Sequence, residues 1–171
     1  MSGAVALGRR ALLALTGITL AEAVRAAPAD LSYSLSKTAP PPRRIERLLV
    51  WLPPDDKAVD SAGFATALST ALASYGTVVQ IGRAKPLELD RATDQAPLAA
   101  SFKPTHRLEI GTSSGSISSG LSRREWAVVK LVLYQGEAKT VSALFTFSAA
   151  GRQISEMAGV LVGKLKLEHY L

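Results

Sequence analysis

The stretch RREWAVVKLVLYQGEAKTVSALFTF, residues 123–147, decides the fold of this chain. Both of its halves are rich in β-branched and aromatic residues, and apolar side chains alternate with polar ones, which is typical of half-buried strands. Gly136 lies in the short connection between the halves, as expected for a hairpin loop. The stretch therefore predicts an antiparallel hairpin with strands over residues 123–134 and 139–147.

The two faces of this hairpin differ in composition. We expect the more uniformly apolar face of the first strand to point to the core, and it consists of Ala127, Val129, Leu131 and Leu133. Trp126, Lys130 and Tyr134 fall on the opposite face. Because amphipathic aromatic side chains are enriched at interfaces, these three residues are candidates for binding a partner. The alternative is that the final helix or the N-terminal segment covers this face.

A strand, a helix and a second strand are predicted upstream of the hairpin. Residues 45–52 are rich in strand formers and end at a pair of prolines, which cannot continue a central ladder. From Phe64 to Tyr75, apolar residues recur every three or four positions, as in an amphipathic helix. Residues 77–81 then read as the next strand.

The segment between this unit and the hairpin is less regular. Residues 87–100 fit either a short helix or a long binding loop, and alternation resumes over residues 106–110. The Gly/Ser run 111–120 has the glycine interval of a phosphate-binding loop, but Leu121 occupies the position where that loop requires Lys. A flexible hairpin connection or a weak, exposed strand end is the better interpretation.

A helix over about residues 152–166 closes the chain. Gly159 and Gly163 lie four positions apart on it, and we expect them to allow close packing on the sheet. The predicted element order is therefore β-α-β-β-β-β-α. This order predicts an α+β fold with a single small mixed or antiparallel sheet of about four or five strands packed against two helices.

The N-terminal end predicts export from the cytoplasm. Two arginines precede an apolar stretch of roughly ten residues, and small residues follow at 26–29, as in a signal peptide. A buried amphipathic helix would have a similar composition, and the pattern leaves Sec and twin-arginine export both open. We therefore predict an export signal over residues 1–29, a Pro-rich flexible tether over 30–43 and one α+β domain over 44–171, located in the periplasm.

Composition limits the possible functions. The chain has no Cys, which excludes a lipid-modified Cys anchor, disulfides and thiol catalysis. The chain carries 20 Lys+Arg and 14 Asp+Glu, of which three and one lie in residues 1–29, so the remainder has a net charge near +4. This modest charge comes without interleaved aromatics or a known motif, so nucleic acid is not an expected partner.

Catalytic and metal-binding patterns are also weak. The two histidines, His106 and His169, have no nearby third ligand in the sequence, and no nucleophile motif accompanies them. Acidic residues at 55, 56 and 60 precede a predicted helix, where helix capping explains them better than acid–base catalysis. We therefore expect a non-enzymatic protein without cofactor or metal.

Five arginines suggest a second kind of partner. Arg123 and Arg124 open the hairpin, and Arg43, Arg44 and Arg47 flank the first predicted strand of the domain. A modest positive surface on an exported protein fits anionic lipid headgroups or lipopolysaccharide phosphates.

The order of these elements resembles that of a group of Gram-negative envelope accessory domains. The strand over 45–52, the helix over 64–75, the PTHRLEI segment at 104–110, the paired strands and the closing helix carry this resemblance. The group includes auxiliary components of ABC-type transport systems, lipopolysaccharide-assembly domains and the TolB amino-terminal region. The resemblance implies a non-enzymatic partner-binding subunit, and it does not assign any functional residue.

Two functions are consistent with these observations. The first is a periplasmic accessory or scaffold domain that binds another cell-envelope protein, as part of a transport or envelope-assembly complex. The second is a small-ligand or lipid-binding module with a cleft next to residues 82–103. A flat aromatic patch would favour the first function, and a deep apolar pocket would favour the second.

Overall fold

The computed structural model describes residues 30–54, 60–86, 91–119, 122–148 and 154–171. The predicted export signal lies outside these residues. In chain order, the elements are β1 (Asp30–Leu35), β2 (Arg47–Leu52), α1 (Ser61–Ala73), β3 (Val78–Arg83), α2 (Arg91–Phe102), β4 (His106–Ser119), β5 (Ser122–Gln135), β6 (Ala138–Ser148) and α3 (Ile154–Leu167). None of the described helices is long and apolar enough to cross a membrane.

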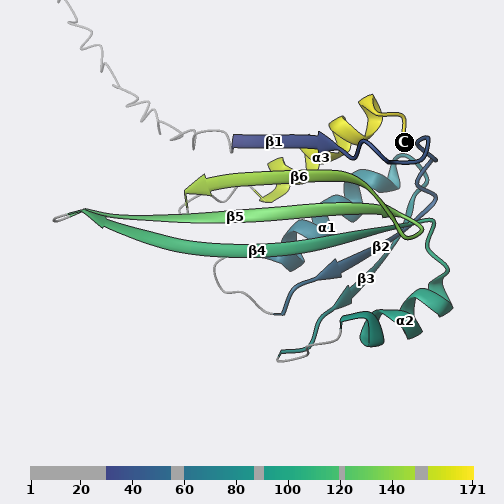
Figure 1. Ribbon diagram of the computed structural model, residues 1–171, viewed down its shortest axis with the longest axis horizontal. Coiled ribbons are helices and arrows are strands. Elements are labelled where there is room, and N and C mark those ends of the chain that lie inside the picture. Colours follow the sequence, from purple (N-terminus) through teal and green to yellow (C-terminus); the bar gives the residue numbers. More distant parts are fainter. Residues whose placement is uncertain (1–29, 55–59, 87–90, 120–121, 149–153) are drawn as a thin grey trace, which may run out of the picture.

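The strands form one mixed sheet in the order β1-β6-β5-β4-β2-β3 (Figure 1). β2 runs parallel to β3 and β4, whereas β4, β5, β6 and β1 pair antiparallel in succession. The α+β class and the hairpin over β5 and β6 are thus confirmed. The predicted numbers of about four or five strands and two helices were wrong, because six strands and three helices are described.

The additional strand, β1, lies where we expected a flexible tether. Residues 30–35 pair with β6 over their whole length, from Asp30 opposite Thr146 to Leu35 opposite Val141. Tyr33 of this strand packs against the core. Serines alternate with larger apolar side chains here, which is a strand period that a short polar segment shows only weakly. The proline run at 40–42 lies in the connection between β1 and β2.

The additional helix, α2, lies in the segment for which a short helix and a long binding loop were both open, and it confirms the helix. It covers β2 and β3 on the face opposite α1 and α3. There the Arg47 guanidinium lies 4.5 Å from the centre of the Phe102 ring. Trp51 is buried between β3 and this helix, because a Cβ at Gly82 would contact both the Trp51 indole and Leu98.

The main core lies between the sheet and the α1–α3 layer (Figure 1). The Asp60 carboxylate starts α1 by accepting a hydrogen bond from the Gly63 N–H at 2.7 Å. The helices and strands bury Phe64, Leu68, Leu72, Leu108, Leu131, Leu133, Phe145, Met157, Leu161 and Leu165. Gly159 and Gly163 are exposed, with no atom within 4 Å of an added Cβ. The expectation that they pack closely on the sheet was therefore wrong.

β4 is much longer than expected. Regular alternation predicted a strand over residues 106–110, but pairing with β5 continues to Ser119. Residues 111–119 of the Gly/Ser run therefore form an exposed strand end, which was one of the two predicted interpretations, rather than a flexible connection. β5 provides the continuous partner that allows small residues of low strand propensity to remain extended.

Candidate binding surface on the uncovered face of the sheet

One face of the sheet has no helical layer over β4, β5, β6 and β1 among the described residues. α1 and α3 pack on the other face, and α2 contacts β2 and β3. We call this surface the open face. Its side chains from the described strands include Arg107, Glu109, Trp126, Val128, Lys130, Tyr134, Ser142 and Leu144, with Ser32 and Ser34 at the β1 edge.

Trp126 is a large exposed apolar side chain on the open face. Its exposed fraction is 36%, and its indole lies across Gly115 on the neighbouring strand β4. A Cβ at Gly115 would lie 2.4 Å from the indole Cζ2 atom. Only glycine therefore leaves room for the ring to lie flat on the sheet, and the flat ring presents its outer side to solvent.

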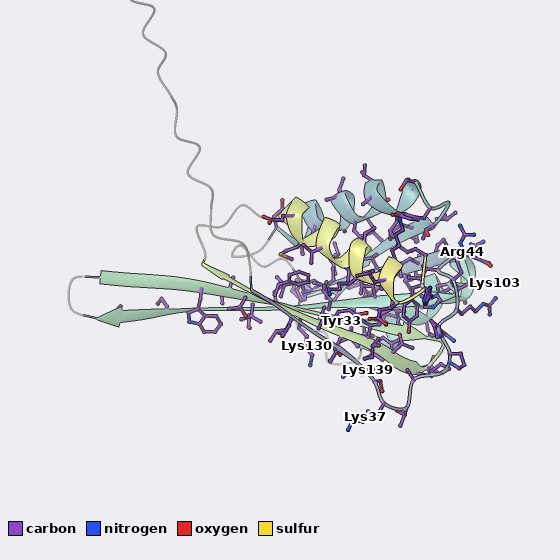
Figure 2. The ribbon with its side chains drawn as sticks, turned by 90° about the horizontal axis from the view of Figure 1, so that it is seen from above. Tyr33, Lys37, Arg44, Lys103, Lys130 and Lys139 are labelled. Atoms are coloured by element: carbon purple, nitrogen blue, oxygen red, sulfur yellow. The ribbon has the colours of Figure 1, made fainter. Side chains whose placement is uncertain are left out.

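Lys130 lies near the middle of the open face (Figure 2). It pairs across the sheet with Gly111 on one side and Leu144 on the other. Leu144 is 39% exposed. The two side chains line a shallow hollow of about 320 Å³ together with Ser32, Ser34 and Ser142. Tyr33 and Ala143 also line the hollow, which thus combines one cation with several hydroxyl groups and apolar side chains.

Tyr134 has a different environment from Trp126. The Arg107 guanidinium lies 4.8 Å from the centre of the Tyr134 ring, and it also forms ion pairs with Glu109 at 3.3 Å and Glu137 at 4.0 Å. Burial and the nearby Glu109 carboxylate raise the pKa of Tyr134 above its usual value. The structure therefore places Trp126, Lys130 and Tyr134 on one face. Unlike Trp126, Tyr134 lies within a cluster of charged side chains.

Two of the arginines predicted to bind anionic lipid, Arg44 and Arg47, make contacts outside this surface. The Arg44 guanidinium donates a hydrogen bond to the Tyr75 carbonyl at the end of α1, at 2.8 Å. Arg47 stacks on Phe102 of α2. The backbone of Arg123 and Arg124 belongs to β5, and their side chains lie outside the described part of the structure.

His106 is a buried residue at the start of β4. Its exposed fraction is 1%, its Nδ1 lies 3.1 Å from the Thr105 hydroxyl, and its ring packs edge-on against Tyr170. Burial lowers its pKa below the usual value, an effect that Arg43 reinforces and a nearby Gln135 amide opposes. His169 is exposed in the C-terminal turn. Within the described residues, no group of three His, Cys, Asp or Glu side chains could hold a metal ion.

The sequence analysis missed several features of the open face. Leu144 was not among the predicted residues, although alternation on β6 places it opposite the inward-facing side chains. The contact between Gly115 and Trp126 depends on the register between β4 and β5. The serines of β1 reach this face only because β1 pairs with β6.

Comparisons with known proteins show where this fold occurs. No family model and no curated protein matches the chain. Among solved structures, the PelC dodecamer from Paraburkholderia phytofirmans is similar over 84% of this chain and 98% of its own, with 16% identity and a TM-score of 0.50. The hypothetical protein CT253 from Chlamydia trachomatis matches over 60% of this chain and 71% of its own, with 11% identity and a TM-score of 0.35. The chain therefore shares its overall fold with PelC.

Proposed function

We propose that this protein is a non-enzymatic accessory or scaffold domain that binds another cell-envelope protein through the open face. The observation that carries the proposal is the exposure of Trp126 and Leu144 on a sheet face without a helical layer among the described residues. Exposed apolar side chains surrounded by polar groups are typical of protein interfaces. Lys130 and the serines supply such a polar surround.

The shape of the molecule favours a protein partner over a small ligand or lipid. The space within the core holds only about 10 Å³ and is lined by leucines, valine and alanine, which is too little for a ligand. The hollow beside Lys130 lies open on the surface of the sheet. A broad, flat surface fits the contact area that two proteins share.

Location and assembly form the other parts of the proposal. The N-terminal pattern of residues 1–29 supports export to the periplasm. The similar PelC structure is a dodecamer. This likeness supports the proposal that the protein acts as an assembly of several copies. Each copy would present its open face to the envelope partner.

Site-specific photo-crosslinking in living cells tests the proposed surface. A photo-reactive amino acid replaces either Leu144 on the open face or Val160 on α3, since both side chains are exposed to a similar extent, 39% and 37%. We expect one dominant envelope-protein adduct from position 144 and none from position 160. The adduct should decrease when Trp126→Ala is added.

Other outcomes would contradict the proposed function. Equal adducts from positions 144 and 160 would show that the open face is not a preferred contact. Adducts with lipid alone would support the ligand-binding module instead. An adduct that is unchanged by Trp126→Ala would exclude Trp126 from the contact.

A further inference from the structure

Over most of its length, one edge of β4 pairs with no other strand in the described part of the chain. β2 pairs with β4 only from His106 to Glu109, whereas β5 pairs with it as far as Ser119. No described residue pairs with the outer edge of residues 110–119, and we call this segment the overhang. In Figures 1 and 2, β4 and β5 extend well beyond the strands on either side.

The overhang exposes a long row of backbone hydrogen-bonding groups. Ten residues of strand span about 33 Å, and alternate residues direct both their N–H and C=O outward. Beyond the pairing of Trp126 with Ser148, only two strands remain in the described part of the sheet. A two-stranded ribbon is marginally stable in water, so a further strand would stabilise it.

The overhang also lacks the features that prevent edge-to-edge association. Natural edge strands are protected by charged residues, proline or bulges. The two outer strands of this sheet follow that rule, since β1 begins with Asp30 and β3 ends with Arg83, shortly before Lys85 and Pro86. The overhang reads IGTSSGSISS, with no charge and no proline, and its pairing with β5 contains no bulge.

These properties favour a second copy of this chain as the partner. In antiparallel pairing about a two-fold axis, each overhang would lie against an identical one. Because the overhang carries no charge, no register of such a pair places like charges opposite one another. Apart from Ile110 and Ile117, the segment consists of Gly, Ser and Thr, so few large side chains lie along the edges that would pair.

We propose that the overhangs of two copies pair edge to edge as antiparallel strands and join their two sheets. This contact deepens the proposed function, because it rests on the proposal that the protein acts as an assembly of copies. It leaves the open face of each copy free for the envelope partner. Larger assemblies would need a second contact elsewhere on the molecule.

The first test adds charge to the overhang and measures association. Ser114 and Ser116 are exposed, so the double variant Ser114→Lys, Ser116→Lys places like charges at the paired edges without disturbing the core. The control, Ala62→Lys with Ala73→Lys, adds the same charge at exposed positions on α1. Analytical ultracentrifugation of the full chain should show a dissociation constant raised at least about tenfold by the overhang variant and unchanged by the control.

The second test uses the absence of cysteine from the chain. Single variants Ser113→Cys, Ser114→Cys, Ser116→Cys and Ser118→Cys place thiols along the overhang, and Thr70→Cys on α1 is the matched exposed control. A short bifunctional thiol crosslinker should join two copies at one or two overhang positions. The position with the fastest crosslinking locates the two-fold axis.

The possible outcomes distinguish the overhang contact from the broader proposal that the protein self-associates. A monomeric wild-type chain at every concentration would overturn both self-association and the overhang contact. An assembly that resists the overhang lysines and gives no crosslinks above Thr70→Cys would overturn the overhang contact alone. Circular dichroism of each variant identifies any loss of fold, and in that case the cysteine series decides.

Discussion

At the residue scale, the burial of the titratable His106 side chain makes the stability of the fold depend on pH. The ring is 1% exposed and its Nε2 atom has no hydrogen-bond partner among the described residues. Burial lowers its pKa, so below about pH 6.5 the unfolded chain, with its ordinary histidine pKa, binds more protons at this residue than the folded protein does. The contribution of His106 to the free energy of unfolding is therefore complete above pH 6.5 and is lost as the pH falls.

We expect the free energy of unfolding to decrease below about pH 6.5, and to decrease less in His106→Gln. Urea unfolding between pH 5 and 8 measures this dependence. His169→Gln, which replaces an exposed histidine, is the control substitution. A His106→Gln profile identical to that of the wild type would contradict the assignment.

Two glycines with different surroundings provide a second prediction at this scale. A Cβ at Gly82 would lie 2.4 Å from the Trp51 ring and 2.8 Å from Leu98, whereas one at Gly159 meets nothing within 4 Å. Gly82→Ala should cost about 1–3 kcal/mol by overpacking. Gly159→Ala, inside an exposed helical turn, should stabilise the protein by about 0.5–1 kcal/mol. Denaturant unfolding of both variants measures the difference, and equal effects would argue against the packing of α2 on β3.

At the element scale, β1 converts a polar N-terminal segment into part of the sheet. Burial, assisted by the charges of Glu168 and Tyr170, raises the pKa of Tyr33 to about 12. A tyrosine in a free tether would titrate near its ordinary value of about 10. Because the folded state retains the proton, the stability from Tyr33 is complete below pH 10 and is lost between pH 10 and about 12.

Tyr33→Phe should therefore reduce the loss of stability between pH 8 and 11. Burial also raises the pKa of Tyr134, so the loss should shrink without disappearing. Chemical unfolding at the two pH values measures the effect. An ultraviolet titration of Tyr33 with a midpoint near 10 would show that β1 does not pack as described.

At the scale of the whole molecule, stability and assembly are linked. If overhangs pair, the native assembly is favoured by mass action, and the melting temperature depends on protein concentration. We expect Tm to rise by about 3–6 °C over about a hundredfold increase in concentration. The Ser114→Lys, Ser116→Lys variant should lose this dependence. Differential scanning fluorimetry at several concentrations measures it, and a constant wild-type Tm would contradict the pairing.

Local sequence patterns were sufficient to predict the elements whose period persists over many residues. Alternation over residues 123–147 predicted the β5–β6 hairpin, and the apolar spacing from Phe64 to Tyr75 predicted α1. It also placed Trp126, Lys130 and Tyr134 on one face. These features depend on neighbouring residues, so a local pattern is sufficient to find them.

Features that depend on contacts between distant residues became clear only from the folded structure. β1 is ordered through pairing with β6, more than one hundred residues later in the chain. Residues 111–119 become strand because β5 lies beside them, and among the described residues β2 pairs with β4 only as far as Glu109. Backbone pairing across such separations is set by the packing of the whole sheet, and the composition of a short segment does not reveal it.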